Sequence, residues 1–227
     1  MKLGISYNIF DCEELLEDSI RNIREVADYI SIVYQEISNH GNKCSDELLP
    51  LIEYLKNEGV VDEVFKYKPN LKGGPHLNEI NKRNIGLSLS EGANCTHHMS
   101  MDADEFYKND EFEYVKKEME ENDYDSSACQ MITYYKEPIY RLDPKEEYFV
   151  SMIYKIRSGV QFEMGKQFPV LVDPTRRMES GNFRKFSRDE IEMHHMSYVR
   201  KDISKKFNDS SAKMNFGDNT NKVLNYY

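Results

Sequence analysis

Apolar residues along the first hundred positions alternate between strand-like runs and helix-like spacing. The run from Lys2 to Phe10 is rich in apolar residues and predicts a strand, and Asp11 with Glu14 then forms a capping-box pattern ahead of apolar residues at helical intervals. The alternation continues with a strand at 29–37, a helix at 48–58, a strand at 61–67, a helix at 77–90 and a strand at 95–101. This order predicts a mostly parallel, three-layer α/β/α sheet, in which ligands bind at the carboxyl ends of the strands.

The pattern changes after a further predicted helix at 109–122. Short strands rich in aromatic residues are predicted at 126–135, 148–156, 168–172 and 193–199. They indicate a mixed sheet with loops. The polar segment 208–227 is predicted to be either a loosely held helix or partly disordered. Because no repeat or linker divides the chain, we expect one domain over residues 1–227.

The chain has 227 residues and a formal charge of −10 at pH 7. An acidic protein repels polyanions, which argues against extended nucleic-acid binding as its main task. A phosphate-bearing ligand would need local Arg and Lys residues or a metal ion. No run of about eighteen apolar residues occurs, so no membrane span is predicted, and peripheral contact through a basic surface stays open. Residues 1–10 lack the pattern of a secretory signal, so we expect a cytoplasmic protein.

The acidic triplet Asp102-Ala103-Asp104 follows directly on a predicted hydrophobic strand. Two carboxylates two residues apart at a strand end can turn toward the same pocket. Hard oxygen ligands suit Mg²⁺ or Mn²⁺, and such ions take one or two carboxylates and complete their shell with water and substrate phosphates. The triplet therefore favours a diphosphate ligand bound through a divalent cation. A solvated acidic turn is the alternative.

A longer pattern around the triplet resembles the nucleotide-binding half of family 2-like GT-A glycosyltransferases. It consists of Lys82-Arg83-Asn84-Ile85-Gly86, a turn with Gly92, an apolar strand and Asp102-Ala103-Asp104-Glu105. The resemblance covers about Leu3 to Phe106. It implies a Rossmann-like nucleotide-sugar-binding half at 1–106, an acceptor and metal-completing half at 107–207, and a tail at 208–227. It further implies that Asp102 approaches the ribose and that Asp104 holds the cation that bridges the diphosphate.

The segment 34–41 departs from the usual acidic and Ser-rich turn of these enzymes, so its contacts with the base cannot be transferred from the family. Gln35 carries a donor and an acceptor together and is our candidate for reading a uracil-type edge, with Tyr7 and Asn8 lining the base pocket. Core packing of Tyr7 and a surface position of Gln35 are the alternatives. Arg83 is predicted to orient a phosphate or to balance the triplet. Its alternative is an ordinary ion pair on a helix surface.

Adjacent histidines on a strand face opposite ways, so only one of His194 and His195 can reach a shared site. The segment His195-Met196-Ser197-Tyr198-Val199-Arg200 resembles the late segment that completes the metal shell in related transferases. The resemblance therefore implies His195 as the third ligand beside Asp102 and Asp104, and an imidazole ligand favours manganese. Arg200 and Lys201 are expected to close over the diphosphate, or else to lie on the surface at a helix end.

Together these residues predict a metal-dependent glycosyltransferase that moves a sugar from a nucleotide-sugar donor, here a UDP-sugar, to a glycan or other hydroxyl acceptor. If the reaction inverts configuration, Asp173, in a loop constrained by proline, is our candidate for the base. A metal-dependent phosphohydrolase or nucleotidyltransferase is one alternative, and a non-catalytic sugar-nucleotide-binding module is another. The sequence leaves open the sugar, the nucleotide, the acceptor and the stereochemical outcome.

Overall fold

The first half of the computed structural model, which describes residues 1–209, alternates strands and helices as predicted. The order is β1 (Leu3–Ile9), α1 (Glu13–Arg24), β2 (Tyr29–Tyr34), α2 (Leu48–Asn57), β3 (Glu63–Lys66), α3 (Pro75–Gly92) and β4 (His97–Met101). Each of these elements overlaps the segment in which the sequence predicts it. Apolar periodicity is therefore a sufficient guide to this half of the molecule.

The second half contains more short elements than the sequence indicates. They are β5 (Glu105–Phe106), α4 (Asn109–Glu121), β6 (Ser126–Tyr135), β7 (Glu137–Arg141), β8 (Phe149–Lys155), a 3₁₀ helix at Pro174–Arg176, β9 (Phe183–Lys185), β10 (Glu192–Tyr198) and α5 (Ile203–Asp209). The strand predicted at 168–172 is wrong, since this segment is irregular. Pro169 lacks the N–H that a ladder requires, and Phe168 packs instead against the rings of Tyr154 and Phe183. Residues 210–227, most of the predicted tail, lie outside the described part of the chain.

The described strands form one ten-stranded sheet in the order β3-β2-β1-β4-β8-β6-β10-β5, with β7 and β9 paired to β6. Strands β1 to β4 pair with one another in parallel, whereas β8 is antiparallel to both β4 and β6. This confirms the predicted arrangement of a parallel sheet joined to a mixed second half. Among residues 1–209, no helix is both long enough and apolar enough to cross a bilayer.

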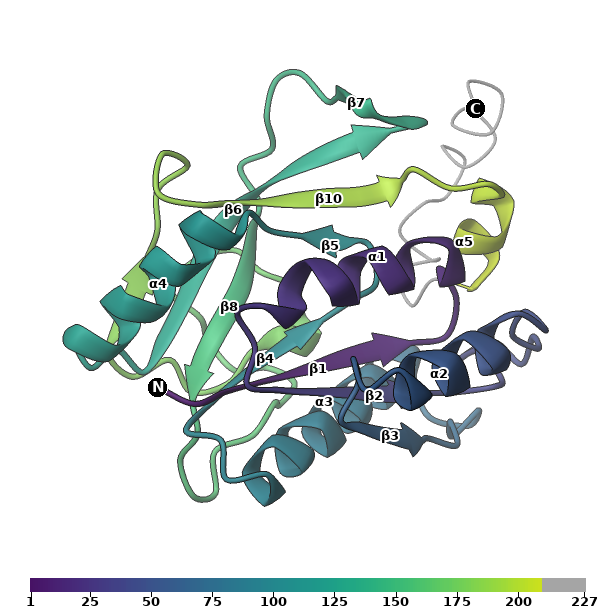
Figure 1. Cartoon of the computed structure of the whole chain (residues 1–227), viewed down its shortest axis with the longest axis horizontal. Coiled ribbons are helices and arrows are strands. Elements are labelled where there is room, and N and C mark those ends of the chain that lie inside the picture. The colour runs from purple at the N-terminus through teal and green to yellow at the C-terminus, as the bar shows by residue number, and fades with distance from the viewer. Residues whose placement is uncertain (210–227) are drawn as a thin grey trace.

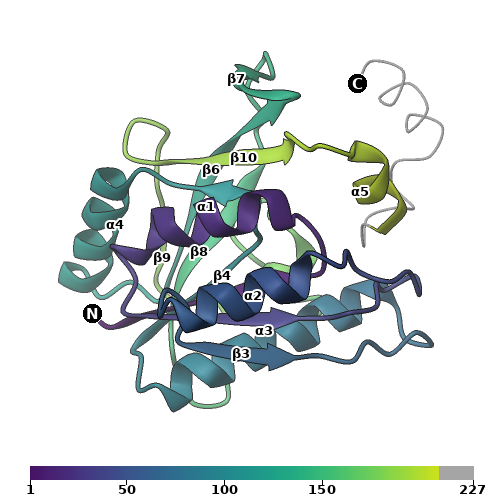
Figure 2. The same ribbon diagram turned by 45° about the vertical axis from the view of Figure 1, so that its right-hand side comes forward.

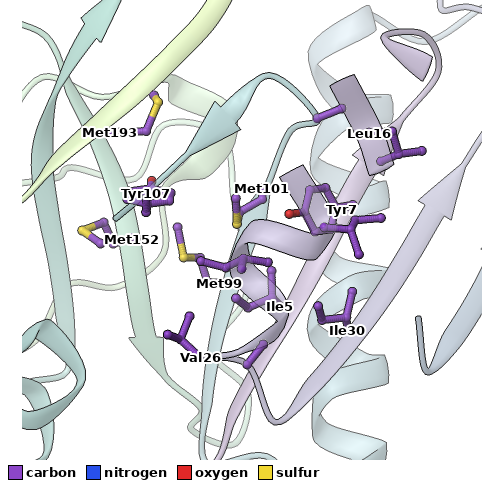
Figure 3. Close-up of a cluster of buried hydrophobic side chains, with 14 of the residues drawn as sticks. Ile5, Tyr7, Leu16, Val26, Ile30, Met99, Met101, Tyr107, Met152 and Met193 are labelled. Carbon is purple, nitrogen blue, oxygen red and sulfur yellow. The ribbon is translucent and has the colours of Figure 1, made fainter. Parts of the chain in front are cut away.

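The two faces of β1 differ in side-chain size, and this difference sets the layers. Leu3, Ile5, Tyr7 and Ile9 belong to the main core together with buried residues of α1, α2 and α4. Figure 3 shows Ile5 and Tyr7 of this set in the core. Gly4, Ser6 and Asn8 face the opposite side, along which α3 lies (Figures 1 and 2). Small residues on this face let the α3 backbone approach closely. The result is a three-layer α/β/α arrangement around the parallel strands.

The turn from β1 into α1 is not the predicted capping box. The residue before α1 is Cys12, whose backbone is left-handed with a φ of 73°, and no side chain caps the helix. Asp11 instead lines a pocket at the end of β1. A tight strand-to-helix turn therefore replaces side-chain capping and turns Asp11 toward that pocket.

We expect Gly86→Ala to destabilise the fold by about 1–3 kcal/mol, because α3 touches β1 at this point. A Cβ on Gly86 would lie 2.5 Å from the Ser6 Cβ, which the strand holds in place. Gly92→Ala in the same helix is the matched control, since a Cβ there meets nothing within 4 Å. Urea unfolding of both variants measures the difference. Equal midpoints for the two variants would show that α3 can move away from β1 without cost.

Candidate functional site

A pocket of about 150 Å³ lies at the carboxyl ends of β1 and β4. Its walls bring together most of the residues predicted from the sequence, namely Asn8, Gln35, Arg83, Asp102, Asp104, Asp173 and Arg200. Lys206 and Asp209 of α5 complete one side, and Figure 2 shows α5 following β10 near the start of α1. The volume is below the range of about 300–1,000 Å³ that is usual for ligand sites.

The register of β1 and β4 explains why their ends meet. The two strands are parallel and pair Ser6 with Ser100 and Tyr7 with Met101, so Asn8 and Asp102 leave the sheet at the same level. Asn8 and Asp102 lie on the same face of the sheet as Ser6 and Ser100, which is the face that α3 covers. On this side Arg83 of α3 donates a hydrogen bond of 2.6 Å to the Ser100 hydroxyl.

Asp102 is held by two guanidinium groups. Its Oδ2 accepts a hydrogen bond of 2.7 Å from Arg176, and its Oδ1 lies 3.5 Å from Arg83 Nη2. Burial acts to raise the pKa of Asp102, but Arg176 and Arg83 outweigh it and keep this pKa below its usual value. Arg176 also pairs with Glu105, so this buried guanidinium bridges one buried carboxylate and the partly exposed Asp102.

Asp104 is 5% exposed and is also paired with bases. Its Oδ2 lies 2.8 Å from Arg200 Nη2 and 2.9 Å from Lys206 Nζ. Burial opposes ionisation, but Lys206 and the other basic groups nearby hold the pKa of Asp104 well below its usual value. The structure therefore contradicts the alternative of a solvated acidic turn, because this carboxylate is buried and compensated.

The other oxygen of Asp104 faces His195. The distance from Oδ1 to His195 Nε2 is 3.7 Å, and two ligands at about 2.1 Å from one ion can be up to about 4.2 Å apart. Burial lowers the pKa of His195 to about 4, so its imidazole is neutral near pH 7, as a metal ligand must be. The pair therefore fits Mn²⁺ or Mg²⁺ as a site with two protein ligands that phosphate and water would complete.

The predicted set of three metal ligands is not assembled. Asp102 is turned into Arg176 and Arg83 because these guanidiniums compensate its charge. Among residues 1–209, no group of three or more His, Cys, Asp or Glu side chains is arranged to hold a metal ion. His194 points the other way, with Nδ1 at 2.8 Å from the Tyr134 hydroxyl. Of the two adjacent histidines, it is therefore His195 that reaches the acidic triplet.

A polar network lines the end of the pocket beside β2. Gln35 is 1% exposed and donates a hydrogen bond of 3.4 Å to Asn39, which donates one of 2.9 Å to Glu79. Glu79 also accepts from Asn8 at 3.4 Å. The Oε1 atom of Gln35 is buried and accepts no hydrogen bond from the described residues. A buried acceptor without a donor at a pocket wall is suited to an N–H of a ligand.

Three predicted residues lie outside this pocket. His195 lines a neighbouring cavity, although it lies close to Asp104. Tyr7 is fully buried in the core and hydrogen-bonds the Ser19 hydroxyl at 3.0 Å, because strand alternation turns it away from Asn8 (Figure 3). Lys201 is exposed and borders a neighbouring surface pocket instead. Lys206, one turn into α5, takes the position beside Asp104 that was predicted for Lys201.

Several pocket residues were not found from the sequence, and the chief ones are Lys82, Lys206, Asn39, Glu79 and, behind the triplet, Arg176. Lys82 directly precedes Arg83, is 2% exposed and lies 3.2 Å from Glu79, so its position beside a candidate phosphate ligand was a usable signal. Arg176 and Lys206 gave no such signal, because they reach the triplet only through tertiary contacts.

Asp173 stands between two cavities. It precedes the 3₁₀ helix, and its Oδ1 accepts hydrogen bonds from the Thr175 amide at 2.7 Å and the Thr175 hydroxyl at 2.8 Å. A second cavity of about 890 Å³ lies beside the first, and the two share Asp102 and Asp173 in their walls. A group held in one cavity can therefore meet a group held in the other at Asp173.

Comparison with known proteins identifies the fold. No protein-family description and no curated protein matches the chain. Residues 1–349 of TarS from S. aureus superpose with a TM-score of 0.54 at 12% identity, covering 87% of this chain and 61% of that chain. The same TarS fragment in complex with UDP superposes with a TM-score of 0.45 at 15% identity, covering 60% of this chain and 37% of that chain. GalNAc-T7 with UDP, GalNAc and Mn²⁺ superposes with a TM-score of 0.44 at 14% identity, covering 60% of this chain and 24% of that chain.

The chain thus spans less than two thirds of each of these chains. The arrangement it shares with TarS is that of the GT-A glycosyltransferases, so the chain has the GT-A, Rossmann-like α/β fold. A fold hosts more than one chemistry, and the function has to be argued from the site.

Proposed function

We propose that the protein is a metal-dependent glycosyltransferase, family 2-like, which uses a UDP-sugar and a glycan or other hydroxyl acceptor within one domain. The observation that supports this proposal most is the pair of Asp104, in the pocket at the ends of β1 and β4, and His195, in the wall of the adjoining cavity, whose side chains are 3.7 Å apart. Lys82, Arg83, Arg200 and Lys206 line the same pocket and offer the positive charge that a diphosphate requires on an acidic protein.

The donor is divided among three parts of the pocket in this proposal. Gln35 and Asn8 receive the base through their amide groups, and the unpaired Oε1 of Gln35 matches the ring N–H of uracil. Asp102 receives the ribose, since its side chain is 38% exposed despite its two guanidinium partners. Arg83, Arg200 and Lys206 contact the diphosphate. The pocket is small for a nucleotide sugar, and movement of the long Lys206 side chain would enlarge it.

Mn²⁺ or Mg²⁺, which Asp104 and His195 would hold, supplies Lewis-acid stabilisation of the departing diphosphate when bound. Arg200 and Lys206 add positive charge at the same point. The Arg200 side chain, which is 5% exposed, is held by Asp104 before any substrate arrives. Preorganised charge of this kind stabilises a leaving group without further rearrangement.

Asp173 is the proposed base of an inverting reaction. In that reaction the acceptor oxygen bonds to the anomeric carbon, the bond from this carbon to the β-phosphate oxygen breaks with its electron pair leaving on UDP, and the acceptor proton passes to Asp173. Thr175 holds one carboxylate oxygen of Asp173, and the other is left for the acceptor. The position of Asp173 in the walls of both cavities supports this role.

A phosphohydrolase that forms an aspartyl intermediate is less well supported, since the paired aspartates follow β4 and each already pairs with basic side chains. A non-catalytic sugar-nucleotide-binding module would have the same pocket but would not catalyse any reaction of the bound nucleotide sugar. Slow metal-dependent hydrolysis of a UDP-sugar separates that module from an enzyme.

We expect UDP to bind in the presence of MnCl₂ and to lose most of its affinity in excess chelator, as measured by calorimetry. TarS has been solved with UDP and with UDP-GlcNAc, which makes these the first probes to use. His195→Ala should weaken manganese-dependent binding by about 100-fold, because it removes a ligand of the ion. His194→Ala is the matched control and should change it little. Full affinity in chelator, or equal effects of the two variants, contradicts the metal assignment.

A further inference from the structure

The cavity of about 890 Å³ beside the donor pocket is formed mainly by strands of the second half. Its walls come from β6, β8 and β10, which are neighbours in the sheet, and from the loop that contains Asp173 (Figure 1). Its volume is within the range of sites for small organic ligands. It reaches the donor pocket only where Asp102 and Asp173 line both, so a ligand here would present one end to the donor.

The charge of this cavity is strongly one-sided. Arg176 and His195 are the basic residues in its wall, and Arg176 is already paired with Asp102 at 2.7 Å and with Glu105 at 3.1 Å. Arg176 itself is buried, with 4% of its surface exposed. Arg176 therefore compensates the carboxylates behind it and has little positive charge left for a ligand.

Three further carboxylates line the cavity, those of Glu146, Glu147 and Asp173. None of them forms an ion pair with a described residue, since the contacts recorded for Glu146 and Asp173 are with hydroxyl or amide donors. Arg188, which reaches the backbone of Glu146, directs its charge to Glu192 at 2.5 Å. A ligand in the cavity consequently meets uncompensated negative charge.

Aromatic rings supply the other recognisable surface. Tyr148, Phe149 and Tyr198 line the cavity and are each partly exposed. Flat aromatic faces pack against the C–H face of a sugar ring, and they also attract a ligand cation. Rings together with free carboxylates are suited to a hydroxyl-rich ligand that is neutral or positively charged.

We propose that this cavity binds the acceptor, and that the acceptor is a saccharide without anionic groups, favoured further when it carries a protonated amine. The proposal rests on the glycosyltransferase function proposed above and defines the substrate class of its second site. Acidic saccharides are excluded by repulsion from Glu146, Glu147 and Asp173. A hydroxyl of the bound saccharide lies at the Asp173 end, where the two cavities meet.

Three disaccharides of matched shape test the proposal: cellobiose, its diamino analogue and cellobiouronate. Binding of each to the full chain is measured by NMR titration at about 20 mM and about 500 mM NaCl, with UDP binding measured separately. We expect the diamino analogue to bind at least tenfold more tightly than cellobiouronate at low salt, with cellobiose between them. High salt should reduce this ratio several-fold, because the selecting carboxylates face solvent.

Glu147→Gln and the double variant Glu146→Gln/Glu147→Gln should lower the ratio of affinities several-fold. The single variant is included because Glu146 also accepts a hydrogen bond from Thr133, so its loss can affect folding. Glu53→Gln/Glu58→Gln, at exposed positions in α2 and directly after it, removes the same charge far from the cavity and should leave the ratio unchanged.

Equal binding of the three disaccharides, binding of none of them, or an equal ratio in the cavity and α2 variants overturns the proposal. Failure of UDP to bind with manganese overturns the proposed function instead. The two results are independent, because saccharide binding is measured without a donor.

Discussion

Asp104→Asn is expected to lower turnover of the preferred UDP-sugar about 1,000-fold, which is the scale of losing one preorganised charge at the leaving group. Asp104 is central to the pocket because one oxygen faces His195 and the other fixes Arg200 and Lys206. The amide keeps the shape and still accepts a hydrogen bond, so the fold should survive with a loss of about 1–2 kcal/mol. Release of UDP gives the rate, and thermal unfolding gives the stability.

The matched control for this variant is Asp46→Asn. It removes the same charge from an exposed ion pair with Lys43 and should leave both turnover and stability almost unchanged. Near-normal turnover of Asp104→Asn would contradict the role at the leaving group. An unfolded Asp104→Asn protein would show that the triplet serves the structure and not the reaction.

Arg176→Met should destabilise the protein by about 3–5 kcal/mol, the largest stability effect that we expect of a single substitution here. The side chains of Arg176 and Glu105 are 5% and 3% exposed, and Arg176 also holds Asp102. Methionine fills much of the space but leaves the buried Glu105 without its counterion, whereas Asp102 keeps Arg83. For a chain of this size the midpoint of thermal unfolding should fall by about 6–20 °C.

Two further variants separate this explanation from simple loss of packing. Arg21→Met breaks an exposed ion pair with Glu17 and should leave the stability almost unchanged. Arg176→Met/Glu105→Gln removes the stranded charge as well and should recover part of the stability. If the double variant is as unstable as the sum of its single substitutions, the buried pair is not the cause.

Residues on β1 and β4 show how far sequence periodicity reaches. Alternation along a strand sends Tyr7 and Asn8 to opposite faces, so the rule applied to the two histidines also implied that only one of these residues could line a pocket. The same reasoning holds for Asp102, which continues the face of Ser100. The alternation of side chains along a strand therefore predicts which face of the sheet each residue occupies, once the end of the strand is known.

Other parts of the site have no local signal. Arg176 lies more than seventy residues after Asp102, and Lys206 lies about a hundred after Asp104. Their contacts depend on the order β4-β8-β6-β10, in which an antiparallel strand separates the two halves. The failed strand at 168–172 has a related origin, since its apolar residues pack as isolated aromatic contacts and not as a ladder.

By itself the sequence determined the alternating elements of the first half, the end of the strand that presents the acidic triplet, and His195 as a candidate partner. These properties follow from short-range periodicity and from the rule that parallel strands collect their carboxyl ends on one side. Only the tertiary structure decided that Asp102 forms ion pairs with Arg176 and Arg83. It also decided that Lys206, and not Lys201, lies beside Asp104, and that Asp173 lines two cavities. These contacts join residues far apart in the chain, and a pairing of charges across a fold is set by topology, which local patterns do not encode.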